Sequence, residues 1–107
     1  MSEASIEEQI QASGASASRI VPADLDAAIH GIDYHVFAGT TVTVCCLTLD
    51  NGFTTIGHSA CADPANFNET IGREIAFKNA REQIWSLLGF RLRDRLKQHV
   101  NAAGEQA

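Results

Sequence analysis

Long apolar runs and cysteines are both scarce in this sequence. No stretch approaches the roughly 20 consecutive apolar residues that a membrane-spanning helix needs. The first ten residues, MSEASIEEQI, are acidic and polar, whereas a secretory signal is basic and then apolar. Three cysteines in 107 residues, an odd number, argue against a disulfide framework. We therefore expect a cytoplasmic protein of one domain that does not associate with membranes.

Positive charge is nearly missing from the first two thirds of the chain. Residues 1–69 hold nine acidic residues against Arg19 alone, a net charge of −8, while residues 70–107 hold seven basic and four acidic residues, a net charge of +3. This division suits an anionic partner or a contact between subunits, and a solvated charged surface would show it equally. The overall charge of −5 disfavours sequence-independent binding to duplex DNA, which depends on many Lys and Arg.

Motifs for phosphate loops and zinc sites are also missing. Neither GxxxxGK nor GxGxxG occurs in the sequence. Cys45, Cys46, Cys61, His35 and His58 form no CxxC and no HxxxH, the spacings that are typical of structural zinc sites. We therefore expect no bound metal and no cofactor.

The clearest predicted element is a β-hairpin. Two β-rich runs, Thr41–Leu49 and Phe53–Ala60, are joined by a short segment that contains Asn51-Gly52. Asn-Gly is the strongest short-range signal for a hairpin, because both residues adopt the positive φ angles that tight turns need.

The two adjacent cysteines lie on the first predicted strand of this hairpin. Neighbouring residues on a strand point to opposite faces, so Cys45 and Cys46 cannot serve one site together. A two-residue loop would set Cys45 opposite His58 as a thiol–imidazole pair, whereas a bulged three-residue loop would put His58 on the face of Val44 and Cys46. Neither register supplies a recognisable orienting group, and Cys often packs as a small apolar residue. We therefore expect no catalytic residues and a protein that is not an enzyme.

Short elements are predicted before the hairpin. Residues 5–11 predict a short helix with Ile6 and Ile10 on one face, and Ser13–Ser18 predicts a flexible linker. The segment RIVPADLDAAIHGI predicts a second helix that ends near Gly31. The following Tyr34–Phe37 predicts a short strand that would add a third member to the sheet.

The longest predicted helix follows the hairpin. Either Asp63 caps it with Pro64 at its first position, or Asn66 caps it with Glu69 reaching back. We expect this helix to end at Gly89 and a C-terminal amphipathic helix to follow, with a tail, NAAGEQA, that frays.

Apolar residues fall on two nearly opposite sides of the long helix. Because a helix on one sheet needs only one apolar face, we expect a second partner: the N-terminal helix, the C-terminal helix or another subunit. The two sets are Ala76, Phe77, Ala80, Ile84, Leu87 and Leu88 on one side, and Phe67, Ile71, Ile75 and Trp85 on the other.

The predicted fold class is α+β. A short N-terminal helix precedes an antiparallel hairpin or three-stranded sheet, a long helix packs on the sheet, and a C-terminal amphipathic helix follows. We divide the chain into a flexible or partly helical arm at residues 1–19, a single domain at 20–90, and a C-terminal helix with a frayed tail at 91–107.

Polar residues of the last two helices, with one from the hairpin, are the candidates for binding a ligand or partner. The same alternation of charge also simply solvates a helix. The order helix, hairpin, long helix is similar to the second half of a double-stranded-RNA-binding domain, so a nucleic-acid-binding module is the alternative, although the lysine cluster of such domains is missing here. The candidates are His58, Arg73, Lys78, Asn79, Arg81, Trp85, Arg91, Arg93 and Arg95.

Several consecutive segments resemble a family of small tailed-phage and prophage proteins called gene-product-49-like. They are PADLDAAI, YHVFAGTTVTVCCLTLDNGF, GHSACADPANFN and IGREIAFKNAREQIW, and they cover about residues 20–90. Ser86 stands after Trp85 where the family has a proline, which allows the helix to continue. The resemblance implies a phage accessory protein that works in the host cytoplasm, with no established activity to transfer.

The phage resemblance favours binding over catalysis. Small phage accessory proteins often block a host or defence protein, or sequester a nucleotide signal. We expect such a role here, in a homo-oligomer whose pockets lie between subunits. A host protein or a small nucleotide is the favoured partner, and nucleic acid is the less favoured one.

Overall fold

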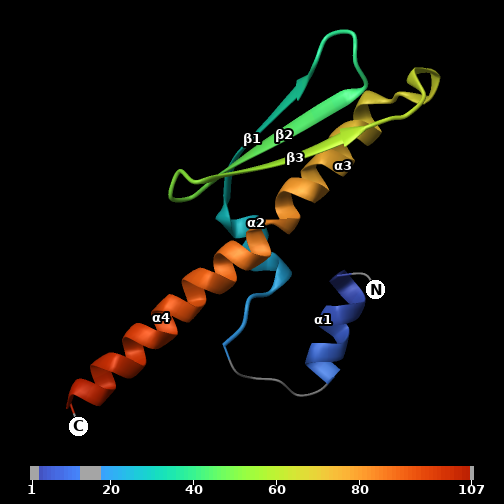
Figure 1. Cartoon of the computed structure of the whole chain (residues 1–107). Helices are drawn as coiled ribbons and strands as arrows, with labels where there is room; N and C mark the ends of the chain where they lie inside the picture. The colour runs from blue at the N-terminus through green and yellow to red at the C-terminus, as the bar shows by residue number, and fades with distance from the viewer. Residues whose placement is uncertain (1–2, 13–17, 107) are drawn as a thin grey trace.

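A three-stranded antiparallel sheet with helices on one side forms the body of the molecule in the computed structural model, which describes residues 3–12 and 18–106 (Figure 1). The expected α+β fold is confirmed. Residues 13–17 of the predicted linker lie outside the described residues. In chain order the elements are α1 (Glu3–Ala12), α2 (Pro22–Ala28), β1 (Ile29–Val36), β2 (Val42–Leu49), β3 (Thr54–Ala60), the 3-10 turn η1 (Pro64–Asn66), α3 (Glu69–Glu82) and α4 (Ile84–Gln106).

The β2–β3 hairpin closes through a three-residue loop. Leu49 N–H donates to the Phe53 carbonyl at 2.7 Å, and Gly52 N–H donates to the Leu49 carbonyl at 2.9 Å. Gly52 has a φ of 86°, in the left-handed region that a glycine adopts without steric cost. Of the two registers left open by the sequence, the structure therefore has the bulged one.

One face of the sheet is covered by α3 and the other is open. On β2, every second residue is buried, and Thr43, Cys45 and Leu47 have no exposed surface. The closest approach is at Gly57 of β3, where an added Cβ would lie 2.2 Å from the Ala80 backbone nitrogen. The sheet and α3 therefore touch backbone to backbone, which only a glycine permits.

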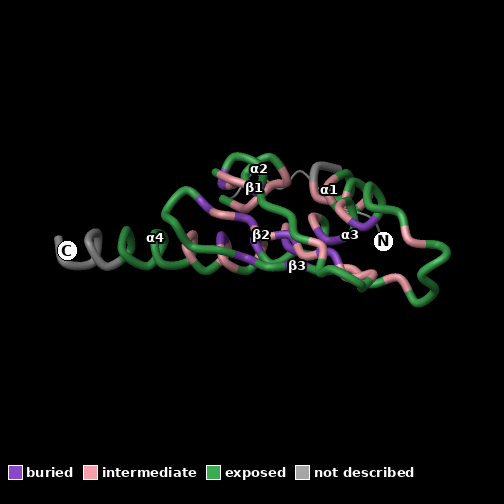
Figure 2. Tube along the Cα trace, turned by 90° about the horizontal axis from the view of Figure 1, so that it is seen from above, coloured by how far each residue is buried: buried purple, intermediate pink, exposed green. Residues whose placement is uncertain are grey.

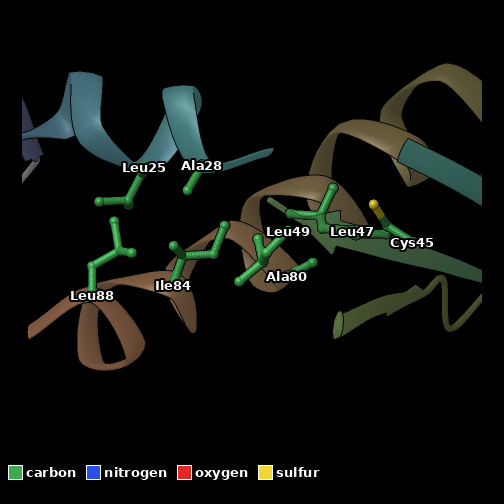
Figure 3. Packing of buried hydrophobic residues seen from close by; sticks show 9 residues of the cluster. Leu25, Ala28, Cys45, Leu47, Leu49, Ala80, Ile84 and Leu88 are labelled. Carbon is green, nitrogen blue, oxygen red and sulfur yellow. The ribbon is translucent and has the colours of Figure 1, made fainter. Parts of the chain in front are cut away.

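The core continues from the sheet into the junction of α2 and α4. Leu25 and Ala28 of α2 face Ile84 and Leu88 of α4, as Figure 3 shows. The buried residues gather where β2, α3 and the start of α4 meet, while residues 93–100 of α4 are exposed (Figure 2). Burial of these side chains holds the helical layer to the sheet.

The prediction for the segment before the hairpin is wrong in its boundaries. The second helix ends at Ala28 instead of Gly31, and the strand begins at Ile29 instead of Tyr34. Ile29 lies opposite Leu49, and the ladder shows a bulge between Ile29 and Gly31. Pairing with β2 outweighs the short helical pattern here, because each added strand residue gains tertiary contacts as well as hydrogen bonds.

The predicted helix boundaries after the hairpin also need correction. Asp63 caps only the short turn η1, and the cap of α3 is Asn68, whose side chain accepts from Ile71 N–H at 3.1 Å. Gly89 does not end the helix, because α4 runs through it to Gln106. The interruption lies at Gln83, whose N–H bonds to the carbonyl of Ala80 in a tighter turn.

The two-sided apolar pattern of the long helix is present in the structure. Ala76 and Ala80 are fully buried against the sheet, whereas Ile71 and Ile75 remain 53% and 45% exposed. Among the described residues, no helix is long and apolar enough to span a membrane.

Candidate functional site

A cavity lies between α1 and the junction of α3 with α4. Its volume is about 530 Å³, within the range of small-molecule sites. Four of the predicted binding residues, Lys78, Asn79, Arg81 and Trp85, line it together. Lys78, Arg81 and Trp85 recur at spacings of three and four residues and so fall on one side of the helical layer, and residues of α1 line the cavity from across it.

Arg81 ties α1, α2 and α3 together at one wall of this cavity. Its guanidinium donates to Glu3 Oε2 at 2.8 Å, to Asp26 Oδ1 at 2.9 Å and to the Pro22 carbonyl at 3.2 Å. The side chain is only 15% exposed. Hydrogen bonds to Glu3 and then to Asp26 raise the pKa of Arg81 above its usual range. The charge of Arg81 is therefore already compensated within the chain.

The opposite wall is supplied by α1, which the sequence did not assign to a site. Ile6 and Ile10 present apolar surface to the cavity, and Glu3 and Glu7 flank them one turn apart. Glu7 accepts a hydrogen bond from Arg19, a second ion pair that holds the helix in place. The sequence signal was the repeat of Ile and Glu at spacing four, which predicts a two-sided helix and hence a partner for its apolar side.

Lys78 and Trp85 are the groups of this cavity best suited to a ligand. Lys78 is exposed and forms no ion pair with any residue that the structure describes. Trp85 is half-buried against the core and offers an aromatic surface. Asn79 is already engaged, because its side-chain amide donates to the His58 carbonyl at 2.9 Å.

The other predicted site residues lie elsewhere. His58 is on the open face of the sheet, opposite Val44, while α3 covers the other face. Burial raises the pKa of the Tyr34 phenol on β1, and the nearby positive charge of Arg73 opposes part of this rise. Arg91 donates to Asp50 at 3.2 Å, near the hairpin turn.

Arg93 and Arg95 are exposed on the distal part of α4. This part of α4 extends away from the body, so neither residue approaches the cavity (Figure 1). The nine candidates therefore form no single site: four share the cavity and five do not.

Cys45 and His58 are not brought together. Cys45 lies opposite Gly57, and His58 lies opposite Val44 on the other face. Burial raises the pKa of the Cys45 thiol, and the residue opposite it on β1 is Tyr34. In the part of the chain that the structure describes, no three His, Cys, Asp or Glu side chains gather as metal ligands would.

Comparison with known proteins identifies one family. The family described as Phage protein (N4 Gp49/phage Sf6 gene 66) matches residues 20–96, more than two thirds of the chain. The matched range includes the sheet, α3 and the first part of α4, and it leaves out α1. Neither the curated proteins nor the solved structures give a match.

Proposed function

The chain belongs to this phage protein family, and from that premise we propose that it is a non-enzymatic accessory protein that captures a ligand in the cavity under α1. Its action is directed against a host process, by sequestering a nucleotide signal or by blocking a host or defence protein. The proposal includes a homo-oligomer in the host cytoplasm. The observation that carries it is the cavity, which collects Lys78, Asn79, Arg81 and Trp85 from separate turns of the helical layer.

A nucleotide matches the chemistry of these walls. A planar base can stack on Trp85 and contact the isoleucines of α1, since base–aromatic stacking tolerates every base. A phosphate can pair with Lys78, whose ammonium has no carboxylate partner among the described residues. Arg81 would contribute through its position, because Glu3 and Asp26 already compensate its charge.

The sole tryptophan makes the proposal directly testable, because Trp85 lines the cavity and no other tryptophan contributes fluorescence. Titration with a panel of linear and cyclic nucleotides should change its fluorescence saturably. We expect Lys78→Gln to weaken the tightest of these about tenfold, the loss of one charge-assisted contact. The matched control is Lys97→Gln on the exposed part of α4, which should bind as the unmodified protein does.

Two results would contradict capture in this cavity. One is a flat fluorescence titration with every nucleotide, and the other is equal affinity in the Lys78 and Lys97 variants. Salt-dependent binding of RNA that disappears in an Arg93→Ala, Arg95→Ala double variant would instead favour the nucleic-acid-binding alternative. Both arginine side chains are exposed and have no ion pair in the described structure, so they are available to phosphates.

A further inference from the structure

The sheet ends on each side in a strand with outward-facing backbone groups. Phe37 N–H donates to the Val42 carbonyl at 3.2 Å, which sets the alternation along β1. His35 and Asp33 therefore direct their backbone groups toward β2, while Ile32, Tyr34 and Val36 direct theirs away from the sheet. Among the residues that the structure describes, no further strand lies on that side of β1.

The two edges differ in how these groups are satisfied. On β3, the Asn79 side chain donates to the His58 carbonyl and the Gln83 side chain donates to the Ile56 carbonyl. On β1, no side chain or loop of the described residues bonds to the outward groups. An unprotected edge of this length is a template for another strand.

The side chains of β1 also leave apolar surface uncovered. Ile32 and Tyr34 are on the face that α3 occupies, yet they are 47% and 41% exposed, because α3 packs on β2 and β3. A further strand beside β1 would cover part of this surface.

We propose that β1 pairs antiparallel with β1 of a second copy of this chain, around a two-fold axis at Tyr34, so that the two sheets become one. This inference deepens the oligomeric part of the proposed function and does not depend on ligand capture. In this register Tyr34 meets Tyr34 of the second copy and Ile32 meets Val36, so all outward groups of these residues find partners.

Charge complementarity selects this register. Asp33 then lies directly opposite His35 of the second copy, in a non-hydrogen-bonded pair where side chains come closest. The imidazole can donate to the carboxylate, and the edge-on contact with Phe37, with ring centroids 4.7 Å apart, holds His35 on that face. The pairing occurs twice by symmetry, because the interface is the same surface on both copies.

Neighbouring registers are less favourable. Moving the two-fold axis to residue 33 sets Asp33 opposite Asp33, and moving it to residue 35 sets His35 opposite His35, both like pairs. In registers shifted by one residue, the outward backbone groups of one copy face backbone groups of the other copy that already bond to β2. Such a shift also moves every side chain to the opposite face relative to its new neighbour. The sequence of β1 therefore matches its own antiparallel copy best at Tyr34.

The test combines mass in solution with hydrogen exchange. Sedimentation over low-micromolar to near-millimolar concentrations should show a monomer–dimer equilibrium. The amides of Ile32, Tyr34 and Val36 should exchange more slowly at high concentration than at low. Asp33→Lys should weaken the dimer about tenfold or more, because each His35 imidazole then loses its carboxylate acceptor and faces an ammonium group, which can only donate.

A charge exchange supplies the matched control. His35→Glu added to Asp33→Lys should restore the dimer, while Glu8→Lys, the same charge change on exposed α1, should leave it unaltered. If Asp33→Lys does not fold, His35→Glu alone carries the same expectation of a weaker dimer. A protein that stays monomeric overturns both this interface and the oligomeric part of the proposed function. An oligomer whose β1 amides exchange equally at all concentrations, or which ignores the charge substitutions, overturns the β1 interface alone.

Discussion

At the β3 edge of the sheet, Asn79 of α3 and Gln83, the residue directly after α3, donate to the outward carbonyls of His58 and Ile56, and at Gly57 the helix backbone touches the strand. At the β1 edge, half-exposed apolar side chains flank backbone groups that have no partner among the described residues, because α3 packs mainly on β2 and β3. The difference arises because a single helix covers about two strands, so a three-stranded sheet with one helix keeps one edge closed and one open. Whether an edge strand is protected therefore depends on its position under the helix as well as on its own sequence.

Gly57→Ala should break the closed side and has the largest expected effect. The new Cβ would lie 2.2 Å from Ala80 N and 2.4 Å from Ala76 O, atoms of the helix backbone that cannot rotate away. We expect a loss of about 3 kcal/mol in the free energy of unfolding, at the upper end for overpacking. Urea denaturation followed by circular dichroism measures it.

Gly31→Ala on β1 is the matched control for this substitution. Its Cβ would meet only Thr48 Cβ at 3.8 Å, an ordinary contact, so the free energy of unfolding should change by less than about 1 kcal/mol. Equal losses in the two variants would show that the backbone contact at Gly57 is not what closes the β3 edge.

Gln83→Ala should open part of the β3 edge at a smaller cost. The Ile56 carbonyl would lose its side-chain donor and accept a hydrogen bond from water instead. We therefore expect the free energy of unfolding to fall by about 1 kcal/mol in the same denaturation measurement. Gln98→Ala, on the exposed part of α4, is the control and should be neutral. The idea that this side chain seals the edge fails if the Gln83 variant is as stable as the Gln98 variant.

The smallest effect is expected at the hairpin turn, where α4 reaches the end of β2 and β3. The hydrogen bond from Arg91 holds the pKa of Asp50 below its ordinary value. Because the pKa is depressed in the folded state, this contribution to stability is present above the unfolded-state pKa and is lost as pH falls through the folded one. Titration of the Asp50 carboxyl by NMR should show the low pKa, and Arg91→Gln should return it upward; an unchanged pKa in the variant would exclude the contact.

Much of the part formed by β2, β3 and α3 was predictable from local sequence. The Asn51-Gly52 turn located the hairpin, and the spacing of Ala76, Ala80 and Ile84 indicated the face of the helix that packs. The prediction was wrong at Ile29, where the apolar pattern of a helix continues in the sequence although α2 ends at Ala28. That boundary depends on β2 being available as a neighbour, which no local pattern contains.

The candidate site was predictable in part. Lys78, Arg81 and Trp85 were chosen as polar or aromatic members of the helical layer, and the structure collects them at one cavity. The N-terminal helix was one of three partners expected for the side of the helix that carries Trp85. Its place at the candidate site was not predicted, because the ion pair between Glu3 and Arg81 that positions it joins distant residues and has no local signature.

By itself, the sequence determined the α+β class, the hairpin and the apolar side of α3, because these follow from residue periodicity and turn chemistry within a few neighbours. Tertiary structure alone decided the strand register that separates His58 from Cys45, the position of α1 over the cavity, and the choice of β1 as the open edge. Each of these depends on contacts between distant segments, whose free energies outweigh local preference only once the chain has folded.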